Sequence, residues 1–216
     1  MSTASFLVQE PHQERSRRTM TRIMDAAARI LEMKTFEQLT IAEVVRAAGT
    51  SVGAFYGRFK DKYGLLQALD ERFFKEFELA VHALLRPSIP EALPVSFIIE
   101  EVTRMLVMIY GSNRGVLRSL NLAARLHGDP RFRQREQRAW GELFPDLQAI
   151  LLAHGDEIGH PEPLLATRFG FQQLFFAMRE LLLWEPLREG VPYEDDVVIA
   201  ELTRAYLAYL RVGDVA

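Results

Sequence analysis

The stretch that most constrains the fold of this chain is residues 39–62, LTIAEVVRAAGTSVGAFYGRFKDK. In its first half, apolar residues recur at i, i+3, i+4 and i+7 between 41 and 48, which predicts a short amphipathic helix. Thr40 stands before this helix and Glu43 follows three residues later, which is the spacing of a capping box. We therefore expect one short helix that begins directly after Thr40.

A second short helix is predicted directly after the first. Gly49 can end the first helix, because glycine accepts a positive φ angle, and Ser51 can cap the next one. The apolar side of the second helix is formed by Val52, Phe55 and Phe59. Two short helices joined by a turn that contains glycine make a helix-turn-helix, whose second helix commonly enters the major groove of DNA.

The second helix also carries chemical groups that suit DNA. Gly53 and Ala54 leave its start almost bare, so its backbone can approach another surface closely. The residues that follow supply a phenol and three cations within one to two turns: Tyr56, Arg58, Lys60 and Lys62. Such groups are suited to phosphate oxygens. We interpret residues 39–62 as a DNA-docking unit.

These residues resemble the sequence pattern of TetR-type (TetR/AcrR) transcriptional regulators, A-G-x-S-x-G-x-L-Y-x-x-F-x-x-K-x-x-L-L. The matching positions are Ala48, Gly49, Ser51, Gly53, Phe55, Tyr56, Phe59, Lys62, Leu65 and Leu66. The resemblance covers roughly residues 16–76 and departs at 57–58 and 63–64, which bear on sequence preference more than on the fold. It implies an all-α protein with a three-helix DNA-binding head, which holds the helix-turn-helix, and a C-terminal helical body for ligand binding and dimerisation.

We expect three segments along the chain. Residues 1–14 form a disordered polar tail, and residues 15–76 form the DNA-binding domain around the motif 40–59. Residues 77–216 form the helical regulatory and dimerisation domain. A helix over about 61–85 is expected to link the head to the body.

An arginine-rich segment stands at the start of the head. It holds Arg15, Arg17, Arg18 and Arg22. As an N-terminal arm it would follow the phosphate backbone or enter the minor groove, and Arg18 is our candidate contact. Equally, basic residues that flank a first helix are often only solvated.

The charge distribution favours a nucleic-acid-binding head. The formal net charge of the whole chain is −3, but residues 15–62 hold ten Lys and Arg against five Asp and Glu, which leaves −8 for the remainder. This asymmetry is expected where a small nucleic-acid head is joined to an acidic body. A chance cluster of solvated charges would look the same, and the position beside the motif favours DNA binding.

Composition places the chain among ordinary globular proteins, with 49% hydrophobic and 25% charged residues. It holds no cysteine, which excludes disulfides and thiolate metal sites and fits a reducing cytoplasm. Residues 1–14 lack the basic region and apolar core of a signal peptide, and no apolar run of about eighteen residues occurs. We therefore expect a cytoplasmic protein without a membrane partner.

In a DNA complex we expect two groups of contacts. The residues that hold phosphates and fix the register are Thr40, Ser51, Tyr56, Lys60 and Lys62. The residues near base edges are Thr50, Val52, Gly53, Ala54, Gly57 and Arg58. Only Arg58 is chemically fit for a bidentate contact with guanine, so thymine methyl contacts and DNA shape are expected to contribute. Two heads would read a pseudo-palindromic operator in double-stranded DNA, with half-site centres about 34–36 Å apart.

The body is expected to dimerise and to bind a ligand. The helix near 163–185 is apolar on several sides, and the helix near 193–211 is amphipathic, so we expect both to pair with their copies in a homodimer. A thick core within one chain is the alternative. Residues that would line a pocket for a small apolar or amphipathic ligand are Phe97, Met105, Met108, Tyr110, Trp140, Phe171, Phe175 and Met178. For any single one of them, plain core packing is the simpler explanation.

The sequence offers little to an enzyme. Glu157-x-x-His160 has the spacing of di-iron helical bundles, but those sites need two such motifs and two further Glu. No P-loop, dinucleotide-binding fingerprint or G-x-S-x-G elbow occurs, so we expect no catalytic residue, cofactor or metal. We predict a transcriptional regulator, by default a repressor that a ligand releases from its operator. The alternatives are a helical-bundle binding protein or an enzyme without DNA affinity.

Overall fold

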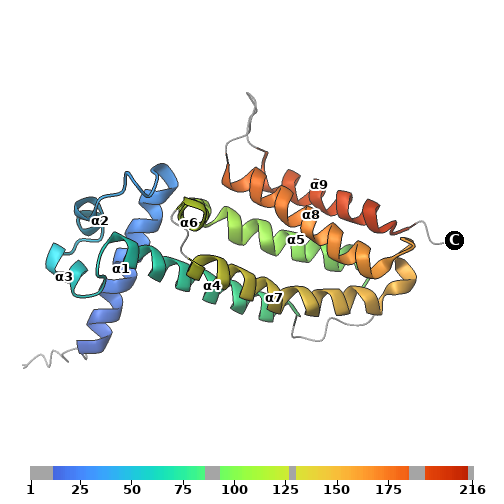
Figure 1. Ribbon diagram of the computed structural model, residues 1–216, viewed down its shortest axis with the longest axis horizontal. Coiled ribbons are helices and arrows are strands. Elements are labelled where there is room, and N and C mark those ends of the chain that lie inside the picture. Colours follow the sequence, from blue (N-terminus) through green and yellow to red (C-terminus); the bar gives the residue numbers. More distant parts are fainter. Residues whose placement is uncertain (1–11, 86–92, 127–129, 185–192, 214–216) are drawn as a thin grey trace, which may run out of the picture. The chain divides into compact units, whose positions relative to one another are not determined.

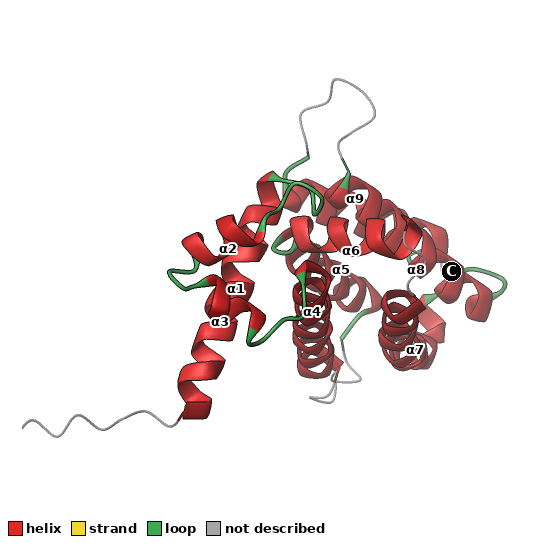
Figure 2. Ribbon diagram, turned by 60° about the vertical axis from the view of Figure 1, so that its left-hand side comes forward, coloured by secondary structure: helices red, strands yellow, loops and turns green. Residues whose placement is uncertain are grey.

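The computed structural model describes residues 12–85, 93–126, 130–184 and 193–213. These residues form helices joined by short loops, and no β-strand occurs among them (Figure 1, Figure 2). The predicted all-α class is confirmed. The helices are α1 (His12–Met33), α2 (Ile41–Ala47), α3 (Val52–Tyr56), α4 (Lys62–Leu85), α5 (Val95–Gly111), α6 (Arg114–Leu126), α7 (Pro130–Ala153), the 3-10 turn η1 (Gly155–Glu157), α8 (Pro163–Leu183) and α9 (Asp195–Leu210).

The chain divides into two compact units, Met1–Leu69 and Asp70–Ala216. The division falls earlier than the predicted boundary after residue 76, and α4 contributes residues to both units. Residues 12–14, which we expected in the disordered tail, belong to α1, because the first turn of that helix extends to His12. Residues 1–11 of the expected tail lie outside the described ranges.

The N-terminal unit packs α1, α2 and α3 around one small core. Its apolar side chains come from all three helices, from the loops before α2 and after α3, and from the start of α4. They are Ile23, Ala27, Leu31, Phe36, Leu39, Val44, Val45, Phe55, Phe59, Leu65 and Leu66, all buried. Five-residue α3 is too short to be stable alone, so its position depends on Phe55 and on the ring contact of Phe55 with Phe59 at 5.2 Å.

The C-terminal unit is a helical bundle in which α8 packs against α5, α7 and α9, and α5 packs against α9. The inner side of α8 is buried through Phe171, Leu174 and Met178. Its outer side exposes further large apolar side chains, namely Leu164, Leu165, Phe169, Phe176 and Leu181. The predicted apolar character on several sides of this helix is therefore confirmed, and only part of it is covered within one chain.

A buried ion pair joins α4 to α7 within the C-terminal unit. The Asp70 carboxylate is 2% exposed and lies 3.2 Å from the guanidinium of Arg135, which also lies 3.4 Å from Glu71. A carboxylate taken out of water needs such a partner, because an unpaired buried charge is strongly destabilising. The role of Arg135 is therefore to neutralise the buried charge of Asp70.

Helices α8 and α9 approach each other closely at Gly170. A Cβ atom built on Gly170 would lie 2.4 Å from Cε2 of Tyr206, so only glycine fits without a shift of the ring. The Tyr206 hydroxyl donates a hydrogen bond to the Thr167 carbonyl oxygen at 2.5 Å, and burial raises the pKa of this phenol. The contact fixes how α8 and α9 lie against each other.

We expect Gly170→Ala to lower the free energy of unfolding by about 1–3 kcal/mol, because the added methyl overpacks a filled contact. Urea unfolding followed by circular dichroism measures this. The matched control is Gly141→Ala in α7, where an added Cβ meets no atom within 4 Å. Alanine there should raise stability by about 0.5–1 kcal/mol, since glycine weakens a helix interior. Unchanged stability in Gly170→Ala would show that the two helices separate freely at this point.

Among the helices that the structure describes, none has both the length and the apolar character needed to cross a lipid bilayer.

Candidate functional site

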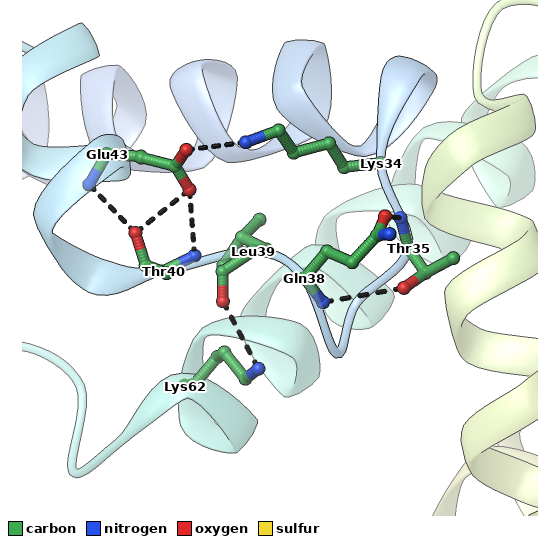
Figure 3. Close-up of polar contacts among 7 residues, drawn as sticks. All are labelled: Lys34, Thr35, Gln38, Leu39, Thr40, Glu43 and Lys62. Carbon is green, nitrogen blue, oxygen red and sulfur yellow. Dashed lines mark hydrogen bonds and ion pairs between the residues drawn. The ribbon is translucent and has the colours of Figure 1, made fainter.

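The start of α2 is fixed by the predicted capping box. The Thr40 hydroxyl oxygen accepts a hydrogen bond from the Glu43 amide at 3.2 Å, and the Glu43 carboxylate accepts from the Thr40 amide at 3.2 Å and from its hydroxyl at 2.9 Å (Figure 3). The Lys34 ammonium adds a hydrogen bond to the same carboxylate at 2.5 Å. The Thr40 side chain is exposed, but its hydroxyl is already engaged in this cap.

The same contacts control the ionisation of Glu43. The hydrogen bond from Lys34, followed by those from Thr40, lowers the pKa of the Glu43 carboxyl from 4.5 to about 2. Both groups stabilise the charged form of the carboxylate. The cap therefore depends on a negative charge at Glu43.

The turn after α2 depends on Gly49 and Arg22. Gly49 has a φ angle of 60°, in the left-handed region that favours glycine, as the sequence predicted. The Arg22 guanidinium donates to the Ala48 carbonyl through Nε at 3.0 Å and to the Gly49 carbonyl at 2.6 Å. Arg22 thus caps the end of α2, whereas the sequence placed it in a DNA-binding arm.

The other arginines of that arm lie on α1. Arg15, Arg17 and Arg18 are exposed, and Arg18 pairs with Glu14 one turn earlier at 3.1 Å. An acidic residue in the first turn and an i, i+4 pair both favour a helix here. The segment is therefore a rigid helical start rather than an extended arm, and Arg18 remains accessible at its surface.

The second helix of the motif presents a small, largely uncharged face. Ser51 caps α3 by accepting a hydrogen bond from the Ala54 amide at 3.1 Å. Val52 is 48% exposed and Tyr56 is 56% exposed, while Phe55 is fully buried. Gly53 and Gly57 are exposed between them, and Thr50 and Ala54 are half-buried. The outer side of α3 consequently offers apolar groups, a phenol and bare backbone.

Arg58 is turned away from this face. Its Nε donates to the Ser16 carbonyl at 3.1 Å, and its two terminal nitrogens donate to the Ala54 carbonyl at 2.7 Å and to the Ser16 hydroxyl at 3.2 Å. A guanidinium committed to α1 and to the end of α3 does not present the free fork that bidentate guanine contact requires. Arg58 thus has a packing role in the structure, and the base contact predicted for it would require these hydrogen bonds to break.

Lys62 is also used inside the fold. Its ammonium donates to the carbonyls of Phe36 at 2.7 Å, of Glu37 at 3.2 Å and of Leu39 at 3.2 Å. It also lies 4.6 Å from the centroid of the Phe36 ring, and Figure 3 shows it reaching the loop before α2. A lysine has three donors, and all three are occupied here. Lys62 therefore has a structural role, and the phosphate contact predicted for it would require at least one of these hydrogen bonds to break.

Two exposed cations remain beside α3. Lys60 is exposed directly after the motif, as predicted. Arg46 is exposed in the last turn of α2, and our reasoning from the sequence did not select it. Val44 and Val45 form the buried side of α2, so Arg46, the next residue, turns away from that side. This helical phase is the sequence signal that could have identified Arg46 as an exposed cation.

Three of the eight predicted pocket residues lie together. Trp140, Phe171 and Phe175 line an open groove of about 650 Å³ between α7 and α8. The other residues that line it are Gln137, Gly141, Phe144, Arg168, Gln172, Phe176 and Arg179. The groove is therefore aromatic at its centre and carries polar groups around it.

The remaining five predicted pocket residues do not line this groove. Met178 is completely buried, Tyr110 packs in the core at 5.8 Å from Phe175, and Met105 is half-buried. Phe97 and Met108 are 46% and 59% exposed. They project from the outer side of α5, because positions 97 and 108 are three helical turns apart on one face. Their selection by residue type ignored this helical phase.

The Glu157–His160 pair has structural contacts. The Glu157 carboxylate accepts a hydrogen bond from the Val95 amide at 3.0 Å, at the start of α5. His160 Nδ1 accepts one from the Glu162 amide at 3.1 Å, and the His160 ring packs against Tyr209. Across the described ranges, no three His, Cys, Asp or Glu side chains are grouped to hold a metal ion.

A comparison with known protein families identifies the family to which this helix-turn-helix motif is similar. Residues 23–69 match the model for bacterial regulatory proteins, tetR family. The chain carries a TetR-family DNA-binding domain. The resemblance seen in the sequence is thus confirmed, and the family in question consists of transcriptional regulators.

Solved structures share the TetR-family fold over nearly the whole chain. The fatty acid degradation regulator FadR from Bacillus halodurans is similar with 18% identity and a TM-score of 0.66, covering 90% of this chain and 97% of that one. A TetR transcription regulator from Haloarcula marismortui is similar with 17% identity and a TM-score of 0.66, covering 89% of this chain and 96% of that one. The TetR-family regulator PfmR from Thermus thermophilus is similar with 20% identity and a TM-score of 0.62, covering 89% of this chain and 98% of that one. No curated protein sequence matches the chain.

The capping box of the TetR-type domain should make its stability depend on pH. Because the pKa of Glu43 is lowered by folding, its charge stabilises the folded state above pH 4.5, and this contribution is lost as the pH falls from 4.5 to about 2. The difference in stability between the wild type and Glu43→Gln should therefore be constant near neutrality and shrink over that window. Urea unfolding at a series of pH values measures it.

A second variant identifies the cause of this pH dependence. Lys34→Met removes the largest contribution to the lowered pKa of Glu43, so the loss of stability should move to higher pH. The assignment fails if Lys34→Met follows the wild-type pH profile.

Lys62 and Lys60 should separate folding from DNA binding. Lys62→Ala removes charge-assisted hydrogen bonds to three carbonyls and should lower the free energy of unfolding by about 2 kcal/mol. Lys60→Ala should change stability by less than about 0.5 kcal/mol. It should instead weaken binding to all duplexes alike and reduce the salt slope of binding by about 1 for each bound head. A stable Lys62→Ala variant with a reduced salt slope would restore the phosphate role for Lys62.

Proposed function

We propose that this TetR-family regulator binds a pseudo-palindromic operator as a homodimer and is a repressor released by a small ligand. The observation that carries the proposal is the exposed outer side of α3. Val52 and Tyr56 stand one helical turn apart on this side and are both about half exposed, so they form one continuous contact surface with an apolar group and a phenol. The major groove, with its thymine methyl groups, is the partner that fits it.

The contacts in the complex follow from what the fold leaves accessible. Val52, Gly53 and Gly57 lie on the exposed side of α3 and are the proposed base-edge and methyl contacts. The proposed phosphate contacts are Arg18, Arg46, Ser51, Tyr56 and Lys60. Thr40, Thr50 and Ala54 contribute through the caps and turn that hold α3 in place.

The proposed dimer uses the outer sides of α8 and α9. Leu165, Phe169 and Phe176 lie at i, i+4 and i+11 on α8, so they share one exposed face of the helix. Burial of this face against a second copy would remove a contiguous apolar patch from water. A two-fold dimer then carries two motifs, which is what a pseudo-palindrome requires.

Ligand response is proposed to pass through α4. The groove residue Trp140 lies 5.4 Å from the Phe77 ring of α4, and Phe175 reaches Phe73 of α4 through Tyr110. A ligand that binds better to one arrangement of these rings shifts the population toward that arrangement. In our proposal the favoured arrangement holds the two heads at a separation that does not fit both half-sites.

Fluorescence anisotropy with duplex DNA from upstream of the gene, at several salt concentrations, tests operator binding. We expect binding at least about 1000-fold tighter than to scrambled duplex, with a steep negative salt slope for the latter. Leu165→Glu should give a monomer by light scattering and lose most of this affinity. Leu79→Glu, an equally drastic change at an exposed position of α4, is the control and should remain dimeric.

The outcomes separate the parts of this proposal. A wild-type protein that is monomeric at micromolar concentration would remove the dimer. If selection from a random DNA pool also yields no preferred duplex, the helical body would belong to a binding protein or an enzyme without DNA affinity.

A further inference from the structure

The groove between α7 and α8 has a nearly continuous aromatic floor. The ring centroids of Trp140 and Phe175 lie 4.1 Å apart, those of Trp140 and Phe171 5.8 Å, and those of Phe144 and Phe171 5.5 Å. Flat apolar molecules bind such surfaces because they displace water and stack on the rings. The neighbouring rings are inclined to one another by 58° for Trp140 and Phe175, 60° for Trp140 and Phe171 and 37° for Phe144 and Phe171. The floor therefore offers both ring faces and ring edges, and it favours an aromatic body that can stack on one of the faces.

The charged side chains that the structure describes in the lining of this groove are both cationic. They are Arg168 and Arg179, which stand with two amide side chains, Gln137 and Gln172, and none of these described lining residues carries a carboxylate. Arg168 is exposed, and none of the described residues forms an ion pair with it. The Arg179 guanidinium lies over the Phe175 and Phe176 rings at 5.6 and 5.3 Å. Cations at the edge of a low-dielectric surface favour an anionic ligand.

Gly141 keeps the groove open from the α7 side. It lies inside α7 and lines the groove, and a Cβ atom built on it would meet nothing within 4 Å. Glycine weakens a helix interior relative to alanine. No neighbouring atom requires the absence of a side chain at this position, so a side chain added there would take up open space at the wall of the groove.

We infer that this groove binds a small organic anion with a flat apolar body. The body lies over Trp140 and Phe175 beside Gly141, and the anionic group is held by the guanidinium of Arg168. The polar rim supplied by Gln137 and Gln172 orients the remaining polar groups. The regulatory meaning of this site rests on the proposed function, since Trp140 also contacts Phe77 of α4, whereas the binding itself is measurable without DNA.

Two fluorescent probes with nearly the same body test the charge. Anilinonaphthalene sulfonate is a flat anion, and N-phenylnaphthylamine has the same ring system without the sulfonate. We expect the wild type to bind the sulfonate at least about 10-fold more tightly, through charge-assisted hydrogen bonds. Arg168→Gln should remove this preference and leave the affinity for the neutral amine unchanged. Arg204→Gln, at an exposed arginine of α9, should leave both affinities unchanged.

Filling the groove tests the location. Gly141→Leu adds an apolar side chain to the groove, starting from a Cβ position with no neighbour within 4 Å, and should abolish the binding of both probes. Gly141→Ala, which adds one methyl group, should retain it. Circular dichroism and thermal unfolding show that each variant is folded. If Gly141→Leu binds the sulfonate as the wild type does, the groove is not the binding site. If Arg168→Gln keeps the preference for the sulfonate, Arg168 does not hold the anionic group.

The DNA assay separates this site from the proposed function. If the sulfonate binds in the groove and operator affinity falls, the anion site and ligand-controlled release from the operator are both supported. If it binds in the groove and operator affinity stays constant, the anion site stands and ligand-controlled release fails. If the wild type binds no specific duplex, the proposed function fails, and the probe measurements still decide the groove.

Discussion

The ammonium group of Lys62 is the point on which the DNA-binding unit depends. It joins the first residue of α4 to three carbonyls of the loop before α2 and packs against the Phe36 ring. That loop ends at the Thr40 cap, so the direction in which α2 starts follows from this contact. The turn held by Arg22 then sets the start of α3. A single internal cation thus fixes one end of the motif, and a second fixes its turn.

Local contacts of the motif were predictable from the sequence, and distant ones were not. The caps at Thr40 and Ser51 join residues that are three positions apart, so a spacing rule identifies them. The positive φ angle at Gly49 follows from the residue type alone. Arg58 bonds to Ser16, 42 residues away, and no local pattern records this. Residue type identified the aromatic groove residues, but their assembly depends on the phase and pairing of α7 and α8.

In our proposal, one aromatic cluster of the C-terminal unit serves both ligand binding and signalling. Trp140 and Phe175 form the floor of the groove and are also the inner contacts of α4, directly at Phe77 and through Tyr110 at Phe73. Side chains in such a core are closely packed and transmit displacement. A molecule that stacks on the floor therefore acts on the same rings that position α4, without a separate relay.

The uncharged face of α3 has a consequence for how well operators are distinguished. Binding through phosphates weakens as salt rises, because the release of counterions into a more concentrated salt solution gains less entropy. Contacts of Val52, Gly53 and Gly57 with base edges involve no ions and lose little. Since Arg58 is engaged with α1, the reading surface adds no salt-sensitive term of its own. Discrimination between operator and random sequence, expressed as a ratio of affinities, should thus stay nearly constant with ionic strength even as both affinities fall.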